Sequence, residues 1–222
     1  MYDQLKNKNL FKMEETMAAG IFEDVDFPWD VLPLIKDYIL KLGAALSEGE
    51  YDQPEEHVWI AKSAKVYPTA TILPPAIIGP KTEVRPGAFI RGNAIVGENC
   101  VVGNSTELKN VILFNNVQVP HYNYVGDSIL GYKSHMGAGS ITSNVKSDKT
   151  NVTIRYQGET IETGLKKMGA ILGNYVEVGC GTVMNPGTVI GSNTNVYPLS
   201  MTRGYIPKGS IYKRQGEVVA KE

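Results

Sequence analysis

A strict six-residue spacing of aliphatic residues runs through the middle of the chain. Every sixth position of this run is aliphatic: Ile60, Val66, Ile72, Ile78, Val84, Ile90, Val96, Val102 and Leu108. Neither an α-helix nor an ordinary strand has a period of six. The spacing is typical of a triangular coil in which each aliphatic residue points inward and three short strands complete one turn. We therefore predict an all-β solenoid.

The same pattern indicates where the coil turns and where it is distorted. Glycine follows the aliphatic position at Ile78-Gly79 and Val96-Gly97, and glycine accepts the backbone angles of a corner. After Leu108 the register slips by one residue to Leu113, and it slips again further on before Leu130. A second regular run follows at Leu172, Val178, Met184, Ile190 and Val196. The slips predict loops or distorted corners in a coil that continues to about residue 200.

Two stretches lie outside the repeat. Residues 29–46, with sequence WDVLPLIKDYILKLGAAL, follow Pro28 and place Val31, Leu34, Ile35, Tyr38, Leu42 and Ala45 on one face of an amphipathic helix that we expect to pack on the coil. Residues 143–169 contain two short alternating segments around Gln157-Gly158, which is typical of a hairpin. We therefore divide the chain into an N-terminal helical appendage (1–57), a β-helix domain (58–210) with a hairpin insertion (143–169), and a C-terminal tail (211–222).

Composition and charge exclude several classes of protein. The 222 residues carry 22 basic and 23 acidic side chains, so the broad positive field that attracts nucleic acids or acidic membranes is absent. No apolar run approaches the ~20 residues that span a bilayer, and the first residues lack the layout of a signal peptide. We expect a cytoplasmic protein with no nucleic-acid or membrane partner. Two cysteines, Cys100 and Cys180, are too few for a disulfide framework or a zinc site.

Several motifs resemble those of the left-handed β-helix acyltransferases with hexapeptide repeats. The segments EVRPGAF (83–89), NSTELKN (104–110), PHYNYVGD (120–127) and HMGAGSITSN (135–144) are similar in order and spacing to the acetyltransferase domain of the bifunctional glucosamine-1-phosphate acetyltransferase/UDP-N-acetylglucosamine pyrophosphorylases. Residues 153–173 are more similar to archaeal-type sugar-phosphate nucleotidyltransferase/acetyltransferases. The resemblance covers roughly residues 58–210. It implies a left-handed parallel β-helix, an exception to the usual right-handed crossover.

The resemblance also implies a reaction. It predicts an N-acetyltransferase that uses acetyl-CoA as acyl donor and a small amino-sugar 1-phosphate, such as glucosamine 1-phosphate, as acceptor, without a metal. Residues 1–57 carry no Gly-rich pyrophosphorylase signature and are too few to build a nucleotide-binding domain, so no pyrophosphorylase activity is expected. Which amino sugar is used, and whether the acyl group is acetyl, stays open.

One histidine and two cations match the positions that carry the family's chemistry. Acetylating an ammonium group requires a base, and histidine accepts a proton near neutral pH. His121 stands in PHYNYVGD where the family has its general base, which makes it the candidate catalytic residue. Arg85 and Lys109 correspond to the pair that holds the sugar phosphate, a role suited to one forked and one compact cation. A histidine that only bonds at a corner, and cations that only face solvent, are the alternatives.

The remaining candidates are assigned by the resemblance alone. Tyr124 and Asn144 match the residues that position the sugar and the reacting amine. His135 also lies in the sugar site, but the family has asparagine there, so the larger imidazole can alter the substrate or abolish activity. Ala138, Cys180 and Pro198 match, more loosely, the strip along which the acetyl-CoA arm lies. Small residues in a solenoid also serve packing.

Two other functions are alternatives to this prediction. A metal-dependent hydratase like the γ-class carbonic anhydrases shares the solenoid, but the histidines His57, His121 and His135 lack the close pair of ligands such a site needs. A non-catalytic module that binds a sugar phosphate or nucleotide sugar is the second alternative. The role of residues 1–57 stays open.

We expect a homotrimer. A single coil offers shallow faces, whereas a ligand site requires a concave surface. In the resembling enzymes three coils stand about a three-fold axis, and each active site lies between neighbours. We therefore expect Arg85, Lys109 and His121 to come partly from different chains, and the hairpin to lean on an adjacent subunit. The alternative is a monomer whose hairpin is a mobile loop.

Overall fold

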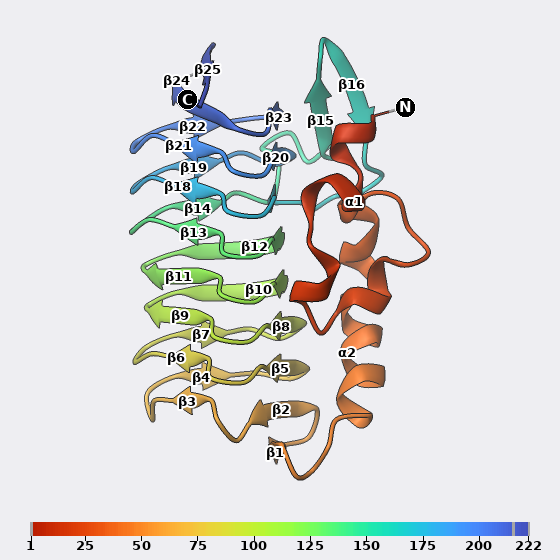
Figure 1. Cartoon of the computed structure of the whole chain (residues 1–222), viewed down its shortest axis with the longest axis vertical. Helices are drawn as coiled ribbons and strands as arrows, with labels where there is room; N and C mark the ends of the chain where they lie inside the picture. Colours follow the sequence, from red (N-terminus) through yellow and green to blue (C-terminus); the bar gives the residue numbers. More distant parts are fainter. Residues whose placement is uncertain (1, 215, 222) are drawn as a thin grey trace.

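The computed structural model describes residues 2–214 and 216–221 and shows a left-handed parallel β-helix with three faces (Figure 1). The first face stacks β2 (Val58–Ala61), β5 (Ala76–Ile78), β8 (Ala94–Val96), the ends of β10 (Glu107–Leu113) and β12 (Tyr124–Leu130), β17 (Ala170–Leu172), β20 (Thr188–Ile190) and β23 (Tyr205–Ile206). The second stacks β3 (Lys65–Val66), β6 (Glu83–Val84), β9 (Val101–Asn104), β11 (Gln118–His121), β13 (His135–Met136), β18 (Glu177–Val178), β21 (Asn195–Val196) and β24 (Ser210–Arg214). The third stacks β4 (Thr71–Ile72), β7 (Phe89–Ile90), the starts of β10 and β12, β14 (Ile141–Thr142), β19 (Val183–Met184) and β22 (Met201–Thr202).

The residues of the six-residue repeat form the core of the coil. From Ile78 to Leu108 each of them is fully buried, and the same holds at Leu172, Met184 and Ile190. Ile60, which lies in the first turn, is only half-buried because no further turn covers it from below. The predicted solenoid is therefore confirmed, and from Ile78 to Leu108 each strand carries one inward-pointing aliphatic residue.

The two register slips are corners shortened by one residue. β10 and β12 each run from the third face to the first without an intervening turn. Asn110 (φ 55°) and Asp127 (φ 47°) bend the chain at these corners in the left-handed conformation. Asparagine and aspartate tolerate that conformation better than other side chains. Each shortened corner therefore keeps the inward register of the next strand.

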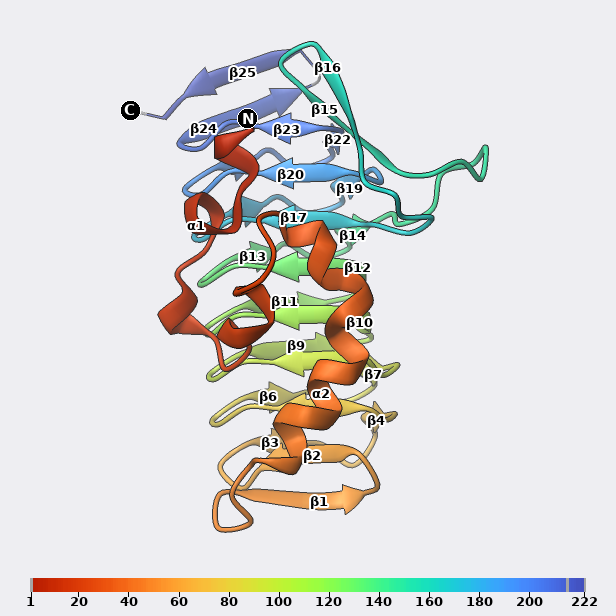
Figure 2. The same cartoon turned by 90° about the vertical axis from the view of Figure 1, so that its right-hand side faces the viewer.

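The N-terminal residues cover the first face (Figure 2). They form the helices α1 (Asn7–Leu10) and α2 (Ile35–Ala44) and four 3₁₀ turns, η1 (Asp3–Leu5), η2 (Met13–Glu15), η3 (Ala19–Phe22) and η4 (Pro28–Leu34). Leu5, Leu10 and Ile39 are buried, and the Phe11 ring stacks on Phe114 of the coil with 4.9 Å between centroids. The N-terminal segment therefore shares one hydrophobic core with the coil, and it leaves the second and third faces open.

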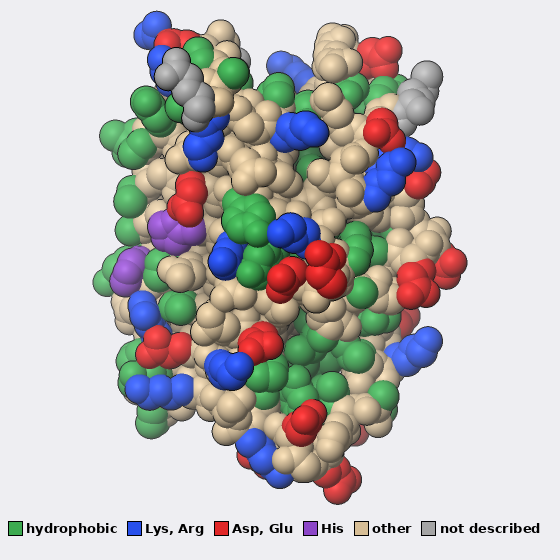
Figure 3. Space-filling view, viewed as in Figure 1, with side chains coloured by type: hydrophobic (Ala, Val, Ile, Leu, Met, Phe, Trp, Pro, Cys, Tyr) green, Lys and Arg blue, Asp and Glu red, His purple; other side chains and the backbone are tan. Residues whose placement is uncertain are grey.

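The expected helix over residues 29–46 is shorter in the structure. Residues 28–34 form the 3₁₀ segment η4, because Pro33 has no N–H to donate and its ring clashes inside an α-helix. The expectation that Leu34 points inward is wrong, since 45% of it is exposed. Figure 3 shows hydrophobic side chains gathered in a hollow between the lower turns and α2. Leu40 of α2 and Trp59 of β2 line one cavity.

Antiparallel strands close both ends of the coil. β1 (Tyr51–Glu55) pairs with β2 at one end, and β24 pairs with β25 (Glu217–Ala220) at the other. The predicted C-terminal tail (211–222) therefore contains paired strand residues. At the other end, β1 lies before residue 58, the predicted start of the coil. The domain boundaries at residues 57 and 210 stay predictions.

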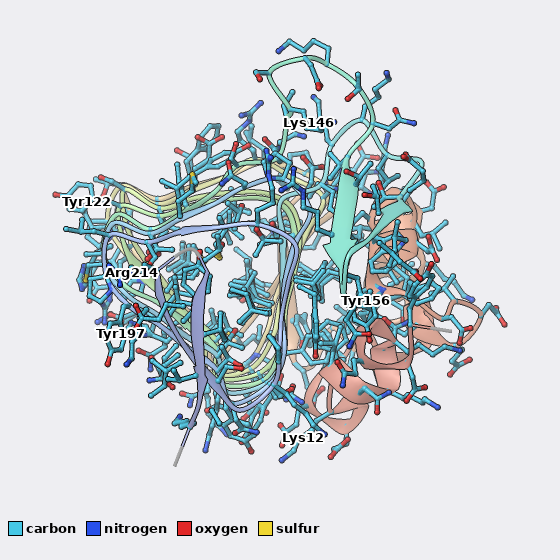
Figure 4. The ribbon with its side chains drawn as sticks, turned by 90° about the horizontal axis from the view of Figure 1, so that it is seen from above. Lys12, Tyr122, Lys146, Tyr156, Tyr197 and Arg214 are labelled. Carbon is cyan, nitrogen blue, oxygen red and sulfur yellow. The ribbon has the colours of Figure 1, made fainter. Side chains whose placement is uncertain are left out.

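The insertion contains the hairpin of β15 (Thr153–Tyr156) and β16 (Glu159–Glu162). Ile154 and Tyr156 are buried, and the Tyr156 ring lies 5.3 Å from Tyr205 of the same chain. The hairpin thus packs on its own coil, and its contact with an adjacent subunit stays a prediction. The part that projects is the loop just before it, which leaves the coil near Lys146 (Figures 2 and 4).

Candidate active site

Five of the candidate residues stack at the corner between the second and third faces, which we call the second corner. The members are Arg85, His121, Ala138, Cys180 and Pro198. Backbone N–H groups of each turn donate to the turn below, from Gly139 to His121 O (3.0 Å) and from Gly181 to Ala138 O (2.9 Å). The proposed base and the proposed acetyl-CoA strip therefore form one ladder along the coil.

Three other candidates meet at the corner between the third and first faces, the third corner. Nδ2 of Asn144 lies 3.3 Å from the Tyr124 hydroxyl oxygen. Nζ of Lys109 and Nδ2 of Asn144 both reach Oδ2 of Asp127, at 3.5 Å and 2.5 Å. The structure therefore brings residues from three turns into one polar cluster, which contains both a cation and hydroxyl and amide groups suited to a sugar phosphate.

Asp127 organises this cluster, although the sequence reasoning did not select it. Its side chain is only 7% exposed, and its Oδ1 accepts a hydrogen bond from Asn110 Nδ2 at 3.0 Å. Asn110 Nδ2 also donates to the backbone oxygen of Leu32, which links the corner to the N-terminal segment. Burial raises the pKa of the Tyr124 phenol, and the charge of Asp127 adds to the shift. The register slip at Asp127 was the available signal.

The second and third corners of one chain lie apart. His121 ends β11 at the second corner and Asp127 bends the chain at the third corner, so the third-face start of β12 separates them. A single chain therefore holds the proposed base and the proposed sugar cluster at opposite edges of one face.

The side chains of His121 and Arg85 at the second corner differ in their hydrogen bonding. His121 is exposed, and its ring makes no hydrogen bond within the part of the chain that the structure describes. Nε of Arg85 donates to Oε2 of Glu83 at 3.1 Å, which leaves its two terminal amino groups available for an anion. Both residues can therefore reach a ligand from this corner.

His135 lies on the second face, away from the sugar cluster. Its Nδ1 is 2.9 Å from Oε2 of Glu177. The two side chains border a hollow of about 340 Å³ together with Gln118 and Lys133. The carboxylate of Glu177 fixes the orientation of the imidazole.

The strip proposed for the acetyl-CoA arm consists of exposed, mostly small residues. Ala138, Cys180 and Pro198 are all exposed, whereas Cys100 is buried and packs in the core. Two bulky residues near them were not selected from the sequence. Tyr122 (φ 51°) and Leu199 (φ 57°) adopt the left-handed conformation and are 64% and 86% exposed. Bulky residues rarely adopt this conformation, and a bulky residue at the corner position where other turns have Gly or Ser was the signal.

Within residues 2–214 and 216–221, no group of three histidine, cysteine, aspartate or glutamate side chains is placed to hold a metal ion. No helix of the same residues is long and apolar enough to cross a bilayer.

Comparison with known proteins gives several relatives of this chain. The chain is 34% identical to the bifunctional protein GlmU of Methanococcus maripaludis over 215 residues, covering 95% of this chain and 52% of the relative. It is 30% identical to a bifunctional sugar-1-phosphate nucleotidylyltransferase/acetyltransferase of Sulfurisphaera tokodaii over 48% of this chain and 27% of that protein. The chain thus spans about half the length of the Methanococcus relative.

Solved structures and family models were compared as well. PerB from Caulobacter crescentus, solved in complex with CoA and GDP-perosamine, aligns over 69% of this chain and 52% of its own at 18% identity, with a TM-score of 0.37. The model of the GMPPB C-terminal domain matches residues 72–196, which is more than half of the 222 residues. The chain therefore belongs to the family of the GMPPB C-terminal domain, within the left-handed β-helices built from hexapeptide repeats.

Proposed function

We propose that the protein transfers an acetyl group from acetyl-CoA to the amine of an amino-sugar 1-phosphate, with glucosamine 1-phosphate as the first candidate. The observation that carries the proposal is the third-corner cluster, in which Lys109, Tyr124 and Asn144 from three separate turns converge around Asp127. The names of the Methanococcus and Sulfurisphaera relatives, a bifunctional GlmU and a sugar-1-phosphate nucleotidylyltransferase/acetyltransferase, support the same chemistry.

The acceptor would be held by charge and by hydrogen bonds. Lys109 and the free amino groups of Arg85 supply the cations for the phosphate. The Tyr124 hydroxyl and the Asn144 amide, 3.3 Å apart, supply polar contacts to the sugar and its amine. Asp127 keeps Lys109 and Asn144 in place, so the acceptor meets groups that are already ordered.

His121 would act as the general base. Its ring is exposed at the second corner and can accept the proton that the ammonium group must lose before it attacks a thioester. Acetyl-CoA supplies that thioester when it is bound. Ala138, Cys180 and Pro198 would line its arm, because they form an exposed strip on the same corner as His121.

The site would be completed between chains of a homotrimer. His121 and the Lys109 cluster occupy opposite edges of the third face on one chain, so a neighbouring chain is needed to bring its second corner next to this third corner. The N-terminal segment covers the first face, which leaves the other two for contact. Exposed Tyr122, Tyr197 and Leu199 on the second corner support a contact there.

A thiol-release assay tests the proposal. The purified chain is incubated with acetyl-CoA and a panel of amino-sugar 1-phosphates, and the freed CoA thiol is measured. We expect release with glucosamine 1-phosphate, and galactosamine 1-phosphate is the second candidate. If calorimetry detects binding of a sugar phosphate without thiol release from acetyl-CoA, the chain is a non-catalytic binding module, and the transferase proposal is wrong.

A further inference from the structure

Three basic side chains outside the proposed site line one small cavity. Lys146 comes from the loop after β14, Arg155 from β15, and Arg203 from the corner after β22. Thr153 and Pro186 complete the walls of the cavity, which has a volume of about 80 Å³. Figure 4 places Lys146 where the projecting loop leaves the coil. Residues far apart in the chain therefore converge at the third corner, in the upper turns.

Glycines in the coil allow β15 to lie directly on this corner. A Cβ atom on Gly204 (φ 72°) would stand 2.6 Å from the backbone oxygen of Arg155, closer than real Cβ contacts allow. Gly187 (φ 81°) makes a similar close approach to the backbone of Thr153. The close packing holds the Arg155 backbone beside the turn that carries Arg203, so the two guanidinium groups share one cavity.

These arginines are not neutralised by carboxylates. No acidic side chain of the described residues lies within 4.0 Å of the charged nitrogens of Arg155 or Arg203. Lys146, in contrast, forms an ion pair with Asp148 at 3.4 Å. Near the C-terminus, Lys213 and Arg214 both form ion pairs with Glu217. Like charges that converge without a counterion repel one another. A guanidinium fork matches the oxygens of a phosphate.

Arg155 and Arg203 also line a second, larger cavity. It has a volume of about 360 Å³. Its other walls are largely apolar or aromatic: Met201, Tyr205, Ile206, Tyr212 and Val218. A cationic end joined to an aromatic, apolar chamber matches a ligand with a phosphate at one end and a flat ring at the other. We propose that these two cavities together bind a nucleoside phosphate.

Two kinds of ligand carry a nucleoside phosphate that reaches the position of these cavities. The third-corner ladder rises from Ser143 to Asn185 and then to Arg203, through the backbone bonds Ser143 N to Met184 O and Asn185 N to Thr202 O. Two steps of ~4.8 Å place Arg203 about 10 Å above the Asn144 level. The phosphorylated adenosine of CoA and the nucleoside diphosphate of a nucleotide-linked sugar share the required chemistry, and both span such a distance.

Calorimetric titration of the full chain tests the site without any transfer reaction, so its failure is separate from a failure of the proposed activity. The probes are adenosine 3′,5′-bisphosphate, the diphosphates of uridine, guanosine and thymidine, and inorganic pyrophosphate. We expect at least one nucleotide to bind about tenfold or more tightly than pyrophosphate. Arg155→Gln and Arg203→Gln should each weaken that nucleotide about tenfold. The matched control Lys213→Gln, whose lysine pairs with Glu217, should change the affinity less than about twofold.

A second variant separates the two cavities. Met201 is 54% exposed and lines only the larger one, so Met201→Ala should keep the fold and weaken the nucleotide while leaving pyrophosphate unchanged. Preference for the adenosine compound identifies the acyl donor as the source, and preference for a nucleoside diphosphate identifies the acceptor. The proposal is overturned if no nucleotide binds, or if binding persists unchanged in a folded Arg155→Gln or Arg203→Gln protein.

Discussion

Nζ of Lys109 lies 3.5 Å from Oδ2 of Asp127, a carboxylate that is almost completely buried. The same carboxylate accepts hydrogen bonds from Asn110 and Asn144. A buried carboxylate with three donors is held firmly in one position, because losing any one donor would leave a buried charge or hydrogen-bonding group unsatisfied. The acceptor side of the proposed site is therefore organised by a residue that need not touch the acceptor.

Asp127→Asn should weaken acceptor binding more than it slows turnover. The amide keeps the size of the side chain but loses the charge that holds Lys109, and its NH₂ faces donors. We expect the KM for the acceptor to rise about tenfold, with kcat changed less than about threefold. Steady-state thiol release measures both constants. Asp52→Asn is the control, because Asp52 is exposed and, among the described residues, pairs with Lys62 alone, at 3.9 Å; equal effects of the two variants would contradict the positioning role.

His121→Ala should lower kcat by about 10²–10⁴-fold, the usual contribution of a general base. The ring is exposed and lacks a partner among the described residues, so the thermal unfolding midpoint should not move. His57→Ala provides the comparison, because His57 is also exposed but stands before the coil. An unchanged kcat in the His121 variant would remove this residue from the mechanism.

Gly204→Ala should destabilise the protein more than Gly209→Ala. Both glycines have positive φ, at 72° and 65°, so both variants strain the backbone. Only the methyl group at residue 204 meets the backbone of Arg155, whereas nothing lies within 4 Å of the one at residue 209. We expect an excess loss of about 1–3 kcal/mol in the free energy of unfolding by urea, as for other overpacked sites. Equal losses would show that the hairpin does not depend on this contact.

The two cysteines should differ in reactivity over a wide pH range. Burial raises the pKa of the Cys100 thiol from 9.0 to about 12, so the reactive thiolate is suppressed in the folded state. Iodoacetamide at pH 8 to 9 should therefore modify Cys180, which is exposed, and spare Cys100 until urea is added. Mass spectrometry of the peptides reads out both sites. Acetyl-CoA should protect Cys180; modification of Cys180 at the same rate with and without acetyl-CoA would remove it from the proposed strip.

The raised pKa of Cys100 also determines the direction in which the free energy of unfolding changes with pH. An unfolded chain loses the Cys100 proton near pH 9 and the folded chain only near pH 12. Between these values the unfolded state binds fewer protons, so this thiol makes the free energy of unfolding fall as pH rises. Below pH 9 it contributes no pH dependence.

Light scattering at micromolar concentration should give a particle three times the 24.3 kDa of one chain. Leu199→Glu should lower that mass, because it places a charge on the most exposed apolar residue of the second corner. Val219→Glu, on β25, is the control for an added surface charge. A wild-type particle near 24.3 kDa would defeat both the trimer and the shared site.

The coil could be predicted from the sequence because each inward position repeats with the same environment in every turn. Leu108 and Leu172 belong to different runs yet occupy equivalent fully buried positions. The third-corner residues Lys109, Tyr124 and Asn144 were found through motif resemblance, and the register slips at Asn110 and Asp127 marked the same corners independently.

Other features depend on contacts that no local pattern records. Arg155 meets Arg203 only because Gly204, 49 residues along the chain, admits β15 onto the corner. The helix before the coil was misjudged for a different reason. Hydrophobic spacing favoured a continuous helix, whereas the missing N–H of Pro33 favoured 3₁₀ geometry.

The path of the N-terminal segment has a consequence for biosynthesis. Leu10 accepts hydrogen bonds through its carbonyl oxygen from Asn174 and from Ser192 Oγ, and the Tyr2 hydroxyl donates to Glu159. These contacts join residues more than 150 positions apart, so they form only after the upper turns have been synthesised. Contacts of such sequence separation slow folding, and apolar residues such as Leu5 and Phe11 stay uncovered meanwhile. In a nascent chain the apolar residues of the N-terminal segment therefore stay exposed until the upper turns have been synthesised. This segment is among the last parts of the chain to reach its native position.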